Sequence, residues 1–157
     1  MTTVAAFARK SPDKPALIYG NGERIETYGE LELRSRRIGH WLRALGLAPG
    51  DGIAAYLAND DEFFDFFWAA HRTGLYFTPV NWHLLEDEIQ YIVDNCDAKL
   101  LVAHVRFAEL AVRVAARAPK LEARVSVGGE IPASSRWRRR WRRSRKTRRS
   151  QTSSRAR

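Results

Sequence analysis

The side chains that most often bind metals or perform catalysis are present in this sequence, but few are spaced for either task. Zinc-binding histidines usually stand one helical turn apart or close to paired cysteines. The four histidines follow neither pattern, so they predict no metal site and are interpreted as packing or surface residues: His40, His71, His83 and His104.

The single cysteine and the acidic residues near position 60 also have simpler interpretations than catalysis. Cys96 continues the apolar face of a predicted helix, so we expect a buried, unreactive thiol. Asp60 and Asp61 precede a predicted helix and are expected to cap it, and Asp65 has neither a base nor a metal partner in its pattern. We therefore predict no catalytic, cofactor-binding or metal-binding residue in this chain.

Arginine and tryptophan alternate in the last 25 residues, which differ sharply from the rest. Residues 133–157 contain 12 basic residues and no acidic one, whereas residues 1–132 contain 15 basic and 18 acidic residues. Such a tail could bind phosphate backbones weakly and without sequence preference, or lie on an anionic membrane. It is also typical of coding DNA translated out of frame, the interpretation we favour. Each predicts a disordered tail, because nothing in it can form a core.

The first 132 residues alternate between strand and helix patterns. Residues 15–19 and 23–27 flank Asn21-Gly22 and predict a hairpin. Thr27 and Glu30 have capping-box spacing at the start of a helix, and Gly46 is suited to its C-terminal cap. Further strands are predicted at residues 53–57, 75–80, 99–103 and 123–127, with helices between them. This order predicts an α/β fold with a mostly parallel sheet.

The aromatic helix after residue 60 could be interpreted as a pocket or as core. Residues 63–68 hold four phenylalanines and a tryptophan around Asp65. Aromatic side chains at helical spacing usually pack against a sheet, so we expect this helix to be largely buried. The run is too short to cross a bilayer. With one cysteine and no signal-peptide pattern, the chain is expected to be cytoplasmic and to lack a transmembrane segment.

Four motifs together resemble the opening of the adenylate-forming enzymes of the acyl-CoA synthetase type, the AMP-dependent synthetases and ligases. In chain order they are SPDKPAL at residues 11–17, TYGEL at 27–31, LGLAPGD at 45–51 and GLYFTPVNWHL at 74–84. The resemblance covers roughly residues 5 to 132, and implies the N-terminal part of a larger domain and so an incomplete sheet.

This resemblance implies the activation of a carboxylic acid with ATP to an acyl-adenylate and its transfer to coenzyme A. ATP, Mg²⁺ and CoA are implied for the intact family, but none of its functional residues can be carried onto this chain. The family's phosphate loop has a Ser/Thr/Gly run before Pro-Lys-Gly, whereas Pro119-Lys120 is followed by leucine and lacks such a run. The chain is therefore expected to be an inactive fragment, with residues 1–132 as its folded part.

Asn81 and Trp82 are the remaining candidate site residues. They follow the end of a predicted strand, where open α/β sheets bind their ligands. In an intact enzyme they would either support a loop or line the substrate pocket. The alternative function is a small, non-enzymatic binding module whose basic tail contacts nucleic acid or anionic membrane.

Overall fold

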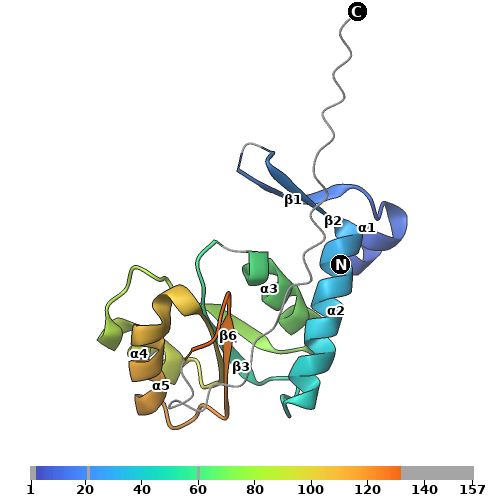
Figure 1. Cartoon of the computed structure of the whole chain (residues 1–157). Coiled ribbons are helices and arrows are strands. Elements are labelled where there is room, and N and C mark those ends of the chain that lie inside the picture. The colour runs from blue at the N-terminus through green and yellow to red at the C-terminus, as the bar shows by residue number, and fades with distance from the viewer. Residues whose placement is uncertain (1–2, 21, 60, 132–157) are drawn as a thin grey trace, which may run out of the picture.

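The computed structural model describes residues 3–20, 22–59 and 61–131, which form a hairpin unit and a layered α/β unit (Figure 1). The hairpin unit comprises α1 (Val4–Lys10), β1 (Pro15–Tyr19) and β2 (Arg24–Thr27). The layered unit follows in the order α2 (Tyr28–Ala44), β3 (Gly52–Tyr56), α3 (Asp61–Thr73), β4 (Tyr76–Pro79), α4 (Glu86–Asn95), β5 (Ala98–His104), a 3₁₀ turn (Val105–Phe107), α5 (Ala108–Arg117) and β6 (Ala123–Val127).

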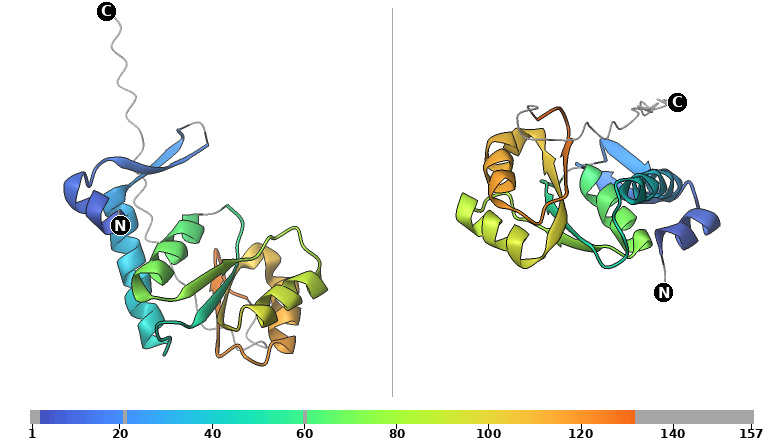
Figure 2. Two further views of the ribbon diagram at one scale, coloured as in Figure 1. Left: turned by 180° about the vertical axis from the view of Figure 1, so that it is seen from behind. Right: turned by 90° about the horizontal axis from the view of Figure 1, so that it is seen from below.

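The layered unit is built on a four-stranded sheet in the order β4-β3-β5-β6, with every neighbouring pair parallel. Helices α2 and α3 cover one face, and α4 and α5 cover the other, as the view from below shows (Figure 2). All five residues of β3 are buried, as expected for a parallel strand enclosed on both faces. The predicted α/β fold with a parallel sheet is therefore confirmed.

The predicted hairpin and the helix after it are confirmed in detail. β1 and β2 pair antiparallel, although Asn21 at the turn lies outside the described residues. Thr27 and Glu30 form the capping box at the start of α2. At its end, Gly46 has a φ of 94° and donates its N–H to Arg43, while Leu47 donates to Leu42. These bonds are a Schellman motif, whose left-handed residue glycine adopts without strain.

A glycine at the start of β3 lets two segments meet. A Cβ on Gly52 would lie 2.8 Å from the carbonyl oxygen of Cys96 and 3.1 Å from that of Asp97. The chain entering β5 therefore passes directly against the start of β3, where the pairing of the two central strands shifts register between Gly52 and Ile53. Any side chain at position 52 would force these backbones apart.

Two of the helices differ from what the sequence predicted. The sequence did not predict α1, which Thr3 caps and whose Phe7 stacks on Tyr28 with ring centroids 4.9 Å apart. α3 is less buried than expected: Phe66 is fully buried, but Phe64 is 38% exposed and its other aromatic residues are half-buried. These half-buried rings pack edge-on against Phe77 of β4 or against their neighbours on α3.

The cap residues of the later helices follow the sequence only in part. Asp60, a predicted cap of α3, lies outside the described residues, and nothing is described of the Asp61 side chain. α4 begins after Leu85, which cannot cap with its side chain; Glu88 instead accepts the Leu85 N–H at 2.8 Å. The acidic first turn of α4 is confirmed and favours the positive end of the helix.

Replacing Thr27 with alanine should destabilise the fold by about 1 kcal/mol, because the Glu30 N–H then loses its side-chain acceptor. Urea unfolding of the whole chain measures the loss. Thr27→Ser keeps the hydroxyl and should retain most of the stability. Equal losses in the two variants would show that the cap is not what Thr27 contributes.

Candidate functional site at the carboxyl edge of the sheet

The carboxyl ends of β3 and β5 mark the point where the chain turns to opposite faces of the sheet. These strands are neighbours, and Tyr56, the last residue of β3, pairs with Ala103 of β5. The helix after β3 packs on one face, whereas the helix after β5 packs on the other. Open α/β sheets bind ligands in the crevice that such a switch of direction creates.

Five aromatic or imidazole side chains gather at this edge, and we call them the edge aromatic cluster. Phe107 lies at its centre, with its ring centroid 5.0 Å from Tyr56, 5.7 Å from Trp82 and 6.4 Å from His104. The planes of Trp82 and Phe107 are inclined by only 16°, so the two rings stack. The His83 ring also contacts Trp82, with ring centroids 3.5 Å apart. Three strand ends therefore contribute to one surface.

Asn81 and Trp82 have different roles in this surface. The Asn81 side-chain oxygen accepts the His83 N–H at 3.0 Å, and the Asn81 carbonyl accepts the Leu84 N–H at 3.3 Å. Asn81 thus shapes the turn after β4, as asparagine commonly does. Trp82, held by that turn, remains 40% exposed. An exposed indole face can stack on a planar group or pack against an apolar chain.

The cluster contains two polar groups, the buried Tyr56 hydroxyl and the half-buried His104 imidazole. Tyr56 is 1% exposed, and its hydroxyl has no hydrogen-bond partner among the described residues. Burial raises the pKa of Tyr56, so the phenol remains a hydrogen-bond donor at neutral pH. Beside it, His104 packs where a side chain on Gly128 would be: a Cβ there would lie 2.2 Å from Nε2. Position 128 therefore has to be glycine for this histidine to fit.

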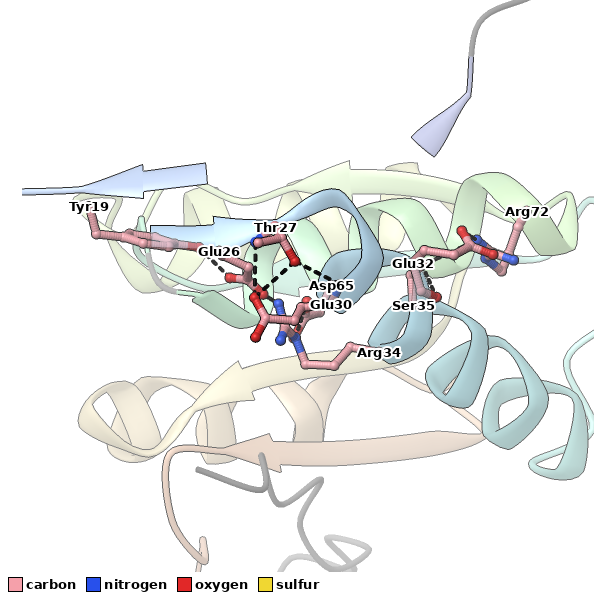
Figure 3. Close-up of polar contacts among 9 residues, drawn as sticks. All are labelled: Tyr19, Glu26, Thr27, Glu30, Glu32, Arg34, Ser35, Asp65 and Arg72. Carbon is pink, nitrogen blue, oxygen red and sulfur yellow. Dashed lines mark hydrogen bonds and ion pairs between the residues drawn. The ribbon is translucent and has the colours of Figure 1, made fainter. Parts of the chain in front are cut away.

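A second polar cluster joins the hairpin, α2 and α3 (Figure 3). The Nε of Arg34 donates to both carboxylate oxygens of Asp65, at 3.0 and 3.1 Å, and its Nη2 pairs with Glu26. Asp65 is fully buried and Glu26 is 2% exposed. Burial raises the pKa of Asp65 to about 6, although the charge and hydrogen bonds of Arg34 act to lower it. One guanidinium group thus serves two buried carboxylates.

The sequence alone did not find this second cluster. Asp65 interrupts an aromatic run, and an acidic residue on an otherwise apolar helix face needs a buried partner. That signal was available, but the partner lies 31 residues away on another helix. The cluster has a structural role: Arg34 joins α2 to α3 through Asp65 and ties the hairpin to α2 through Glu26.

Comparison with known proteins gives the family of this chain. The family model described as AMP-binding enzyme matches residues 4–153. The chain belongs to this family. The match also runs past the change of composition at Ala133, so the boundary at residue 132 and the out-of-frame interpretation of the tail stay predictions.

The curated relatives of this chain reported below are ligases that act on carboxylic acids. A fatty acid–[acyl-carrier-protein] ligase from Streptomyces coeruleorubidus is 32% identical over 119 residues, which cover 75% of this chain and 22% of that enzyme. A 3-oxocholest-4-en-26-oate–CoA ligase from Rhodococcus rhodochrous is 32% identical over 116 residues, covering 74% and 20%. The chain therefore spans about a fifth of the length of these curated relatives.

Solved structures agree with this assignment. The fatty acyl CoA synthetase of Mycobacterium tuberculosis superposes with a TM-score of 0.71 at 25% identity, covering 78% of this chain and 25% of that one. The described fold therefore corresponds to part of an acyl-CoA ligase.

The family implies ATP, Mg²⁺ and CoA for the intact enzyme, but the residues of this chain do not fit a phosphate loop. Lys120, in the Pro-Lys pair, lies between α5 and β6 and is ion-paired with Asp97. Within the described ranges no three His, Cys, Asp or Glu side chains are grouped to hold a metal.

The remaining candidates from the sequence are dispersed or inert. Of the histidines, His83 and His104 meet Trp82 and Phe107 at the carboxyl edge, while His71 contacts Trp68 of α3. Cys96 is half-buried rather than buried, and its Sγ lies 3.5 Å from the Val93 carbonyl. No helix in the described part of the chain is long and apolar enough to cross a membrane.

Asp65 should make stability fall as the pH rises. Its folded-state pKa of about 6 lies above the ordinary value of 3.8, so the folded state binds more protons between these values. The stabilisation present below pH 4 is thus lost as the pH passes through 6, by on the order of 2 kcal/mol. Urea unfolding between pH 4.5 and 7.5 should show wild type losing stability relative to Asp65→Asn over this range.

Asp51 provides the opposite case as a control. The Ala48 N–H and Lys99 lower the pKa of Asp51, so its stabilisation is present at neutral pH and is lost on acidification. The free energy of unfolding of wild type should therefore increase relative to that of Asp51→Asn as the pH rises. If the stability difference from wild type changed with pH in the same direction for both variants, the pKa of Asp65 would not be raised.

Proposed function

We propose that residues 3–131 are the opening part of the large domain of an acid-activating ligase. The reaction proposed for the intact enzyme is the ATP-dependent conversion of a carboxylic acid to an acyl-adenylate, followed by transfer of the acyl group to a thiol such as that of CoA. The observation that carries this proposal is the family match over residues 4–153. The acyl-CoA ligase folds that superpose on the sheet support it.

Within that enzyme, we propose that the edge aromatic cluster faces the substrate. Trp82 is the exposed member and lies at the carboxyl edge, where ligands of such sheets bind. Asn81 positions it through the turn after β4. Trp82 would line the substrate pocket, and Asn81 would act through Trp82 rather than by touching substrate itself. An enzyme of this kind is expected to work in the cytoplasm, in fatty acid or related acid metabolism.

The 157-residue chain should form no acyl-adenylate by itself. It has no glycine-rich phosphate loop and no lysine placed to stabilise charge developing on the phosphates. Acid-dependent pyrophosphate exchange with ATP, measured on protein free of host synthetases, is expected to equal the no-enzyme control. Exchange above that control would refute the proposal that this segment is inactive.

A chimera tests the proposed role directly. Residues 3–131 would replace the aligned segment of the Streptomyces coeruleorubidus ligase. We expect the chimera to catalyse acid-dependent pyrophosphate exchange, because the fold is shared. Trp82→Ala in it should raise the KM for the acid by about tenfold, the loss of one packed aromatic contact, while Trp82→Phe should retain most of the affinity.

Two results would count against this role. An inactive but folded chimera would show that the segment does not serve as the family's opening part. An active chimera whose KM is unchanged by Trp82→Ala would leave Trp82 as loop support only. Leu33→Ala on α2 is a matched control, since this apolar side chain is 48% exposed and lies outside the cluster.

For the tail we propose weak polyanion binding and an out-of-frame origin. Its 12 basic residues should bind nucleic acid without sequence preference, with affinity that falls steeply as salt rises. Deleting residues 133–157 should abolish this binding in a filter or anisotropy assay. Binding that persists would place a polyanion site in the body. A phosphate loop encoded downstream in another reading frame would support the out-of-frame origin.

A further inference from the structure

A small basic hollow lies between α2 and α3, away from the carboxyl edge. It has a volume of about 140 Å³ and is lined by six residues: Arg36, Gly39, His40, Arg43, Arg72 and Thr73. Arg72 and Thr73 end α3, and Gly74 just after them accepts a hydrogen bond from Gly50, just before β3. The hollow is therefore at the amino edge of the sheet, opposite the edge aromatic cluster.

The α2 residues that line the hollow share one face of the helix. Positions 36, 39, 40 and 43 are three or four residues apart, so they lie on one face of the helix. Gly39 lets α3 come close: a Cβ there would lie 3.1 Å from Cδ of Arg72 and 3.2 Å from Cγ2 of Thr73. The Arg72 side chain is thereby held across the α2 face instead of extending into solvent.

The cations in this hollow are poorly compensated. Among the described residues, Arg36 and Arg43 have no hydrogen-bond or ion-pair partner. Arg72 donates to Glu32 and to Ser35, but its Nε is buried and has no acceptor in the described structure. Three permanent positive charges thus face one carboxylate. A buried donor without an acceptor costs free energy that a bound anion would recover.

Helix dipoles explain only part of this arrangement. Arg43 and Arg72 lie in the last turns of their helices, where positive charge is favourable. Arg36 lies in the middle of α2, so the dipole gives it no such role. Nor does a dipole satisfy the buried Nε of Arg72, whose geometry calls for a hydrogen-bond acceptor.

We propose that this hollow binds a phosphate monoester. Guanidinium groups match the oxygens of phosphate in charge and in geometry, and several around one hollow favour a dianion over a carboxylate. The volume admits one tetrahedral oxyanion with its ester oxygen directed outward. The site is independent of the proposed ligase reaction, because none of its residues belongs to the edge aromatic cluster.

The test is calorimetric titration of the whole chain with inorganic phosphate at fixed ionic strength. Arg36→Gln and Arg43→Gln should each raise the Kd about tenfold, the loss of one charge-assisted hydrogen bond. Both side chains are exposed, so neither substitution should disturb the fold. Arg37→Gln is the matched control: it removes the same charge from the same helix outside the hollow, and should change the Kd less than twofold.

This design separates the hollow from the basic tail, which is present in every variant. Equal effects of Arg36→Gln and Arg37→Gln, or no saturable binding by wild type, would overturn the proposal. Two further probes identify the source of the phosphate: glycerol 3-phosphate stands for soluble metabolites, and phosphatidylcholine vesicles containing phosphatidic acid stand for lipid headgroups. The source of the phosphate is the probe that wild type binds with the lower Kd and for which Arg36→Gln raises the Kd.

Discussion

The pairing of β3 with β5 is the constraint on which the rest of the structure depends. Both strands are buried on both faces, so helices have to cover the sheet from each side. The contact of Gly52 with the backbone around Asp97 brings the two strands together at their start. The chain then leaves them toward opposite faces, which is where open α/β sheets bind ligands. Tyr56 and His104 lie at the ends of these two strands.

The candidate sites lie at the two edges of the sheet, whereas a buried ion pair holds the hairpin. The carboxyl edge collects Trp82 and Phe107 from loops that share no sequence motif. The hairpin adds no strand to the main sheet, and is tied to the layered unit through the pairing of Glu26 on β2 with Arg34 on α2. Such a buried pair does little for net stability but fixes one arrangement of its partners, since breaking it leaves a charge uncompensated.

The sequence predicted well wherever local chemistry decides the structure. Thr27 and Glu30 cap α2 and Gly46 ends it, because these interactions span only a few residues. The parallel sheet followed from alternating patterns, and the four motifs led to the family that the comparison confirmed.

The features that the sequence did not predict depend on contacts between distant segments. The α1 helix is short and stabilised by the stacking of Phe7 on Tyr28, and the exposure of Phe64 depends on which face of α3 meets the sheet. Asn81 and Trp82 could be placed at a strand end, but not their separate roles, because the stacking of Trp82 on Phe107 joins residues 25 positions apart. The sequence also gave no sign that Arg36 and Arg72 share one hollow.

Native-state hydrogen exchange on the whole chain tests the central claim most directly. If the β3–β5 pair organises the fold, the amides of these two strands should be the slowest to exchange and should respond together to denaturant, as in global unfolding. The amides of β1 and β2, which form a separate two-stranded sheet, should exchange faster. Exchange in β3 and β5 as fast as in the hairpin would contradict the account, because the carboxyl edge would then have no rigid frame.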